Sequence, residues 1–221
     1  MPLYLRPHAG VAERVLLPGD PGRALRLAQQ LLSEPKMLNH NRGLWGYTGA
    51  AGDGEPMTIQ STGLGGPSAA IVVHELIALG ARRLVRVGTC GALAQLPLGS
   101  LVIAETVEAR DGASRALGAA ETLAADPDLL AALLAAGDGA AAGRLVSTDL
   151  YYAPAPATDA LAVDLTTGAI LAVAARDGAA AAGVLAVSDR LDSGERLDAE
   201  GLERAEVELG RVGAAALSSS S

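Results

Sequence analysis

The sequence predicts an α/β fold, in which a mixed β-sheet carries helices on both faces. Short apolar runs typical of buried strands alternate along the 221 residues with longer amphipathic stretches typical of helices. One early pair of strands follows in direct succession, which predicts a hairpin and a sheet that is not wholly parallel. Half of the residues are apolar, and no linker or internal repeat divides them, so a single domain is expected.

The first strand and helix have clear sequence signals. Residues 14–17 are an apolar strand that Pro18-Gly19 ends. Asp20-Pro21 then supplies a helix N-cap followed by proline at the first helical position. A helix is therefore expected to run to about residue 32.

The later elements follow from the same two patterns. Further strands are predicted at residues 43–50, 56–61, 84–87, 101–105, 145–147 and 184–187. Further helices are predicted at residues 67–79, 128–136, 165–176 and 198–217. Residues 111–121 show no clear period and are expected to form a surface loop, and the serines 218–221 are expected to form a disordered tail.

Charge and composition exclude several classes of protein. The formal net charge of −8 argues against a general nucleic-acid binder, which needs a basic surface. No apolar run reaches the roughly 18 residues of a membrane span. The first eight residues lack the pattern of a secretory signal, so we expect a cytoplasmic protein. The single cysteine, Cys90, excludes an internal disulfide and a cysteine-cluster zinc site, and we expect it to be a small, inert, buried residue.

Two glycine-rich turns after strands are candidate anion sites. Gly19 lies between the first strand and a helix N-terminus, where backbone N–H groups are free, and Arg23 adds a guanidinium in the first helical turn. The alternative is an ordinary capped helix start. Farther on, Arg86 lies inside an apolar strand, where an unpaired cation is costly, and Thr89 follows at its end. A buried carboxylate or a bound oxyanion would each compensate Arg86.

Two other turns at strand ends are also candidates for a binding or catalytic site. The glycine-rich segment at residues 63–68 departs from a dinucleotide fingerprint, because Ser68 takes the place of the last glycine. Asp189 ends the apolar strand at 184–187, where it is either a turn residue or a general acid at the edge of a pocket.

Five segments, in order, resemble one enzyme family. They include Leu-Pro-Gly-Asp-Pro-Gly-Arg-Ala at 17–24 and Arg-Val-Gly-Thr-Cys-Gly-Ala at 86–92, and the others lie at 41–49, 65–68 and 187–189. The chain is similar here to the bacterial hexameric-type purine nucleoside phosphorylases, within the wider nucleoside phosphorylase and uridine phosphorylase family. The resemblance implies one domain over residues 1–217, with a partly barrel-like mixed sheet flanked by helices.

The resemblance implies phosphorolysis of a purine nucleoside to free base and (deoxy)ribose 1-phosphate. Inorganic phosphate is then the co-substrate, and no cofactor or metal is needed. Gly19, Arg23, Arg86 and Thr89 fall on the phosphate-binding positions. Arg42 matches an arginine that a neighbouring subunit contributes to the same phosphate.

Other positions match the nucleoside site of the family. His8 matches a histidine that crosses the subunit interface to the ribose 5′-hydroxyl, so a homo-oligomer is expected, either a dimer or a trimer of dimers. Asp189 matches the acid that protonates the purine at N7, and Arg204, or alternatively Arg196, matches an assisting arginine. The remaining nucleoside-binding positions are Tyr151, Leu165, Thr166 and Ser188.

The chain departs from the family at the sugar. The family pattern Glu-Met-Glu is here Asp164-Leu165-Thr166, so a hydroxyl replaces the carboxylate that binds both ribose hydroxyls. A slow enzyme, an enzyme for another sugar, and an inactive homologue that binds phosphate or a phosphorylated ligand all remain open. A uridine phosphorylase is the other alternative, but residues 153–158 lack the Gln and Arg with which those enzymes bind uracil.

Overall fold

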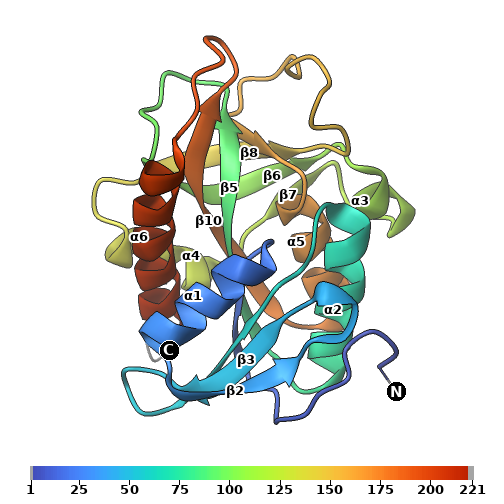
Figure 1. Ribbon diagram of the computed structural model, residues 1–221. Helices are drawn as coiled ribbons and strands as arrows, with labels where there is room; N and C mark the ends of the chain where they lie inside the picture. The colour runs from blue at the N-terminus through green and yellow to red at the C-terminus, as the bar shows by residue number, and fades with distance from the viewer. Residues whose placement is uncertain (1, 219–221) are drawn as a thin grey trace.

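Strands and helices alternate along residues 2–218, the part of the chain that the computed structural model describes (Figure 1). This confirms the predicted α/β class. The strands of this part are β1 Arg14–Leu17, β2 Ser33–Asn39, β3 Gly46–Ala50, β4 Pro56–Gln60, β5 Arg83–Ala92, β6 Leu101–Ala109, β7 Thr122–Ala124, β8 Ala141–Ser147, β9 Ala162–Asp164 and β10 Ala180–Arg190. The α-helices are α1 Pro21–Leu31, α2 Gly66–Ala78, α3 Gly112–Ala116, α4 Pro127–Ala136, α5 Thr167–Asp177 and α6 Ala199–Ser218.

The strands form one mixed sheet that closes on itself at one end. Its order is β10-β6-β8-β9-β5-β1-β4-β3-β2, with β7 paired to β6. Because β10 also pairs with β5, the strands β10, β6, β8, β9 and β5 form a partly closed barrel. The predicted hairpin is the antiparallel pair β3 and β4.

Helices cover both faces of the sheet. In Figure 1, α1, α4 and α6 lie on one side of the strands, and α2, α3 and α5 lie on the other. One buried apolar cluster joins α1 to α6, with Leu27 and Leu209 among its members, and a second joins α2 to α5, with Val72 and Ile170. The two faces therefore have separate cores.

The first strand and helix form as predicted because their signals are local. The Asp20 carboxylate accepts a hydrogen bond of 2.7 Å from the backbone N–H of Arg23, which caps α1. Other elements differ from the prediction. Strands β5, β6, β8 and β10 are longer than their predicted apolar runs, because ladder pairing continues beyond those runs, through small residues such as Gly88 and Gly183.

One α-helix and three strands of the described residues were not predicted. The prediction of a loop at residues 111–121 is wrong over α3, because the Asp111 carboxylate accepts from the Ser114 N–H at 2.8 Å and caps a short helix. Strand β2 is an exposed edge strand with Pro35 in it, so it has no alternating pattern. The strands β7 and β9 have three residues each and form through pairing alone.

The described part of the chain ends in the long helix α6. Helix α6 runs through Ser218, and the rest of the predicted serine tail lies outside the described residues. Among residues 2–218, no helix has both the length and the apolar character needed to span a bilayer.

Candidate active site

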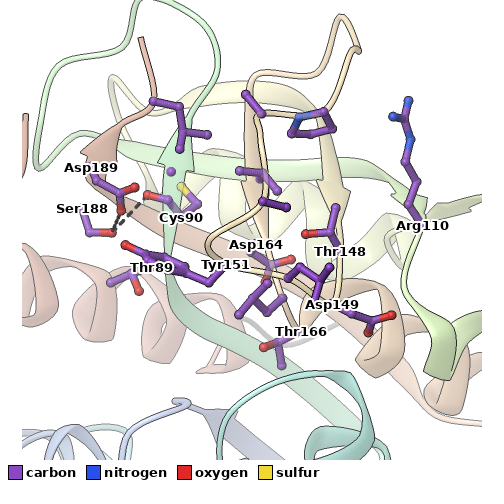
Figure 2. Close-up of a pocket in the computed structure, with 18 of the residues that line it drawn as sticks. Thr89, Cys90, Arg110, Thr148, Asp149, Tyr151, Asp164, Thr166, Ser188 and Asp189 are labelled. Atoms are coloured by element: carbon purple, nitrogen blue, oxygen red, sulfur yellow. Dashed lines mark hydrogen bonds between the residues drawn. The ribbon is translucent and has the colours of Figure 1, made fainter. Parts of the chain in front are cut away.

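A cavity of about 380 Å³ opens where several barrel strands end (Figure 2). The last residues of β5, the segment after β8, the end of β9 and the end of β10 line most of it. The order of the strands brings together residues that are far apart in the sequence. Ligands of open α/β folds bind at such strand ends.

Arg86 provides a buried positive charge in this cavity. Its side chain is 5% exposed, and its Nη1 donates to the backbone oxygen of Leu17 at 3.1 Å. Its Nε has no hydrogen-bond partner, and no described carboxylate forms an ion pair with it. Burial lowers the pKa of Arg86 to about 10, although the Asp164 carboxylate opposes this change. The unused Nε and the missing ion pair favour the oxyanion interpretation of Arg86.

Two glycines position the Arg86 guanidinium. A Cβ on Gly88 would lie 2.4 Å from Arg86 Cζ, so only glycine leaves room for the side chain to fold back along β5. A Cβ on Gly19 would lie 3.4 Å from Arg86 Nη1, which places the turn after β1 directly beside the guanidinium. The structure therefore brings together Gly19 and Arg86, and Thr89 lines the same cavity.

Arg23 lies near the Arg86 guanidinium but does not line the cavity. Its guanidinium pairs with Glu206 of α6, with 2.8 Å between Nη2 and Oε1. Its charge contributes to the lowered pKa of Arg86, so the two guanidinium groups are close enough to repel. The sequence did not reveal Glu206, because it lies on a helix at the other end of the chain.

An acid and a hydroxyl form another part of the cavity wall. Asp189 is 7% exposed, and the Ser188 Oγ lies 2.8 Å from its Oδ1 and 3.2 Å from the backbone oxygen of Cys90 (Figure 2). The other carboxylate oxygen faces Gly91, whose Cβ would lie only 3.0 Å away. Burial raises the pKa of the Cys90 thiol, which keeps it protonated and inert as expected. Asp189 is thus a buried acid with one oxygen fixed by Ser188.

Asp164 has a structural role that the sequence analysis did not assign. Its carboxylate accepts from Ser147 Oγ at 2.5 Å, from Thr167 Oγ1 at 2.7 Å and from the Thr167 N–H at 3.0 Å. It therefore caps the N-terminus of α5 and fixes the wall from β9 to α5. An aspartate three residues before a helical N–H is a capping signal, so the spacing of Asp164 and Thr167 predicts this role.

Leu165 and Thr166 follow Asp164 on the cavity wall. Thr166 is only 4% exposed, and its hydroxyl forms no hydrogen bond with any described residue. Because Thr166 lines the cavity and its hydroxyl has no such bond, this hydroxyl is available to a polar group of a ligand.

Tyr151 lines the cavity from the segment after β8. Of the two candidate assisting arginines, Arg196 and Arg204, only Arg196 contacts this ring among the contacts of the described residues. The Arg196 Cζ lies 5.9 Å from the centroid of the Tyr151 ring, in a cation–π contact. Arg204 instead pairs with Glu200 one turn earlier on α6, at 2.6 Å, and its side chain is 67% exposed. The structure brings the alternative, Arg196, to the edge of the site and does not bring Arg204 there.

His8 and Arg42 lie away from the chain's own cavity. Both side chains are exposed. His8 stacks on His40 with 5.4 Å between ring centroids, and the Arg42 Cζ lies 5.2 Å from the centroid of the Tyr4 ring. Neither residue lines the cavity of its own chain, as a contribution to a neighbouring subunit would require.

The far end of the cavity carries arginines that the sequence analysis missed. Arg110 and Arg115 line it, and Figure 2 shows Arg110 at the opposite end of the drawn residues from Asp189. Arg110 donates to the backbone oxygen of Ala157 at 3.1 Å and pairs with Glu108 at 2.6 Å. These residues fall in or beside the segment predicted as a loop, which offered no spacing to interpret. Within residues 2–218, no group of His, Cys, Asp or Glu side chains is arranged to hold a metal ion.

These features define a class of protein. A buried guanidinium with an unused N–H, free hydroxyls and a buried acid meet at the strand ends of a partly closed barrel. An arrangement of this kind is suited to a small polar molecule together with an anionic group.

Sequence comparison identifies the family within this class. Residues 13–218 match the Phosphorylase superfamily, so the chain belongs to this family, and its barrel-containing sheet is the nucleoside phosphorylase fold. Among its relatives is a purine nucleoside phosphorylase DeoD-type from Oceanobacillus iheyensis, 34% identical over 86% of this chain and 87% of that protein. Proteins of the same description from Roseobacter denitrificans and Caldanaerobacter subterraneus are 36% and 34% identical, over 88% and 91% of this chain and 89% and 93% of their own lengths.

Proposed function

We propose that this protein is a purine nucleoside phosphorylase, which converts a nucleoside and inorganic phosphate to free base and (deoxy)ribose 1-phosphate. The observation that carries the proposal is the buried Arg86, whose Nε has no partner, in the same cavity as the buried acid Asp189. The names of the relatives, which match along most of the chain, support it further.

In this proposal phosphate binds at the Gly19 turn. The Arg86 guanidinium and the Thr89 hydroxyl donate to its oxygens, and the backbone at Gly19 approaches closely because it has no side chain. Arg42 of a neighbouring subunit completes the site, and Arg23 joins it from α1. The dianion then stabilises the positive charge that develops on the sugar as the base departs.

Asp189 is the proposed general acid. It gives a proton to N7 of the purine, which relieves the negative charge on the leaving base. Ser188 fixes one oxygen of the carboxyl, so the other is left for the base. Arg196 is close enough to the site to assist in this step, whereas Arg204 would have to leave Glu200 first.

The nucleoside lies between the Tyr151 ring and the wall formed by Leu165 and Thr166. Tyr151 packs against the base, and the Thr166 hydroxyl donates to or accepts from a sugar hydroxyl. His8 of a neighbouring subunit binds the 5′-hydroxyl. The protein is therefore a dimer or a trimer of dimers, and a monomer by light scattering would contradict the shared site.

Two observations bear on the alternatives. The segment Ala153, Pro154, Ala155 and Pro156 lines the cavity without any side-chain hydrogen-bonding group, which favours purine over uridine. Thr166 stands where a carboxylate would bind two sugar hydroxyls, which favours the second candidate function, a weak or inactive homologue that binds phosphate or a phosphorylated ligand.

The test is release of base from inosine, adenosine, their 2′-deoxy forms and uridine, with and without phosphate. We expect release from a purine nucleoside that depends on phosphate. The Asp189→Asn variant keeps the size of the side chain and should lose most of this activity, with phosphate binding retained. Release without phosphate would contradict the proposal. No release from any substrate, with phosphate still raising the melting temperature, would favour the inactive homologue.

A further inference from the structure

A buried carboxylate outside the cavity binds two arginines of the first helix. Glu206, on α6, is 3% exposed. It pairs with Arg23 at 2.8 Å and, through its other oxygen, with Arg26. The Arg23 side chain is 8% exposed and that of Arg26 is 41% exposed. One carboxylate thus joins a buried arginine to a half-exposed one.

The packing of α6 on α1 fixes this arrangement. Gly210 lies one turn after Glu206, and Leu27 lies one turn after Arg23. A Cβ on Gly210 would lie 2.3 Å from Leu27 Cδ2, so the two helices approach closely only because this residue is glycine. The close contact holds Glu206 beside Arg23.

The two buried arginines near the anion site, Arg23 and Arg86, differ in their partners. Arg23 lies close enough to Arg86 for their positive charges to repel, and no described carboxylate pairs with Arg86. Glu206 compensates Arg23. Even so, the Arg23 Nε is buried without a hydrogen-bond partner, so Glu206 does not satisfy the whole guanidinium.

We propose that Glu206 is an internal counter-anion that competes with phosphate for Arg23, and that Arg26 is the cation that stays on Glu206 when phosphate takes Arg23. The proposal rests on the anion site of the proposed function and adds two positioning residues to it. No covalent bond changes. Glu206 pairs with both arginines in the structure, and when phosphate binds, it takes Arg23 while Glu206 keeps Arg26.

This exchange is possible because Arg26 remains paired with Glu206. Removing Arg23 from a buried carboxylate would normally leave an uncompensated charge, which is strongly unfavourable. Here the second oxygen of Glu206 is already paired, so the carboxylate is never left alone. Phosphate affinity therefore depends on two side chains that do not touch the cavity.

Substitutions of Glu206 and of Arg26 should change the affinity for phosphate in opposite directions. In Glu206→Gln the competitor is neutral, so phosphate should bind about fivefold more tightly, even if the variant melts at a lower temperature. In Arg26→Ala the release of Arg23 becomes costlier, so phosphate should bind about fivefold more weakly. The readout is the Kd of inorganic phosphate by titration calorimetry on the full chain.

Matched controls come from the same helix. Glu208 pairs with Arg211 at 2.6 Å on the exposed side of α6. Glu208→Gln and Arg211→Ala remove the same groups and should leave the Kd for phosphate unchanged. A lower melting temperature alone would not distinguish the variants, because any lost ion pair lowers it.

The Kd values of the two variants either support or overturn the proposed competition between Glu206 and phosphate. An unchanged or weaker affinity in folded Glu206→Gln would show that Glu206 is only structural or that it directs Arg23 to the anion, and either overturns the proposal. Should Glu206→Gln not fold, Arg26→Ala decides alone, and an unchanged Kd there overturns it. A wild-type protein that binds no phosphate would contradict the proposed function as well, whereas normal wild-type binding with unaltered variants contradicts only this inference.

Discussion

Replacing Gly88 by alanine is the smallest change expected to remove Arg86 from the anion site. Gly88 is buried in β5 and does not line the cavity. The added Cβ would lie 2.4 Å from Arg86 Cζ and Nη2, where ordinary van der Waals contact begins at 3.4 Å. The guanidinium must therefore move by about 1 Å or more, because the strand backbone on which both residues lie is held by pairing to β10 and β1.

The size of the effect follows from this displacement. A charge-assisted hydrogen bond contributes about 1.5–3 kcal/mol, and a misplacement of about 1 Å in an active site costs on the order of 100-fold in rate. We expect kcat/KM for phosphate to fall by about 30- to 100-fold. The loss should appear mainly in the KM for phosphate, since the proposal assigns Arg86 to the phosphate rather than to the base.

The assay is base release as a function of phosphate concentration, together with the melting temperature. Gly143→Ala in β8 is the control, because its Cβ would meet only the flexible end of Leu161, at 2.9 Å, outside the cavity. A folded Gly88→Ala protein with the wild-type dependence on phosphate would refute the assignment of Arg86.

Three further predictions use the same assays. Thr166→Glu restores a carboxylate at the sugar, so kcat/KM for ribonucleosides should rise by roughly 30- to 1,000-fold, and an unchanged rate would show that the sugar does not bind there. Arg196→Ala should lower kcat by about tenfold and Arg204→Ala should not, and the reverse result would restore Arg204 as the assisting arginine. Because Arg86 binds phosphate only as a cation and its pKa lies at about 10, phosphate affinity should fall as the pH rises through 10, and a constant Kd there would contradict this.

Local signals predicted the part of the fold that positions the anion site. The strand before Gly19, the cap at Asp20 and the cation inside an apolar strand at Arg86 each depend on residues close in sequence, and all three are present. The edge strand at 33–39 could not be predicted in this way, because backbone pairing with β3 rather than side-chain burial forms it.

The candidate site was predicted best where the side chain follows directly from a strand end. Thr89, Thr166 and Asp189 all line one cavity, because barrel closure brings these ends together. Arg204 was matched to the family's assisting arginine by its place on the helix that follows Asp189, where a shift of one residue turns a side chain by about 100°. It accordingly pairs with Glu200 on the exposed side of α6.

The hardest features to predict were carboxylates, because their partners decide their roles. Asp164 and Thr166 lie on the same wall of the cavity. The carboxylate oxygens of Asp164 already accept hydrogen bonds from Ser147 and from the N-terminus of α5, so they are less available to a sugar. Glu206 looks like one acid among several on a surface helix, but a glycine contact one turn away buries it against Arg23. In both cases the partners of the carboxylate decide its role: Asp164 is occupied by hydrogen bonds within the cavity wall, and Glu206 is occupied by Arg23 and Arg26.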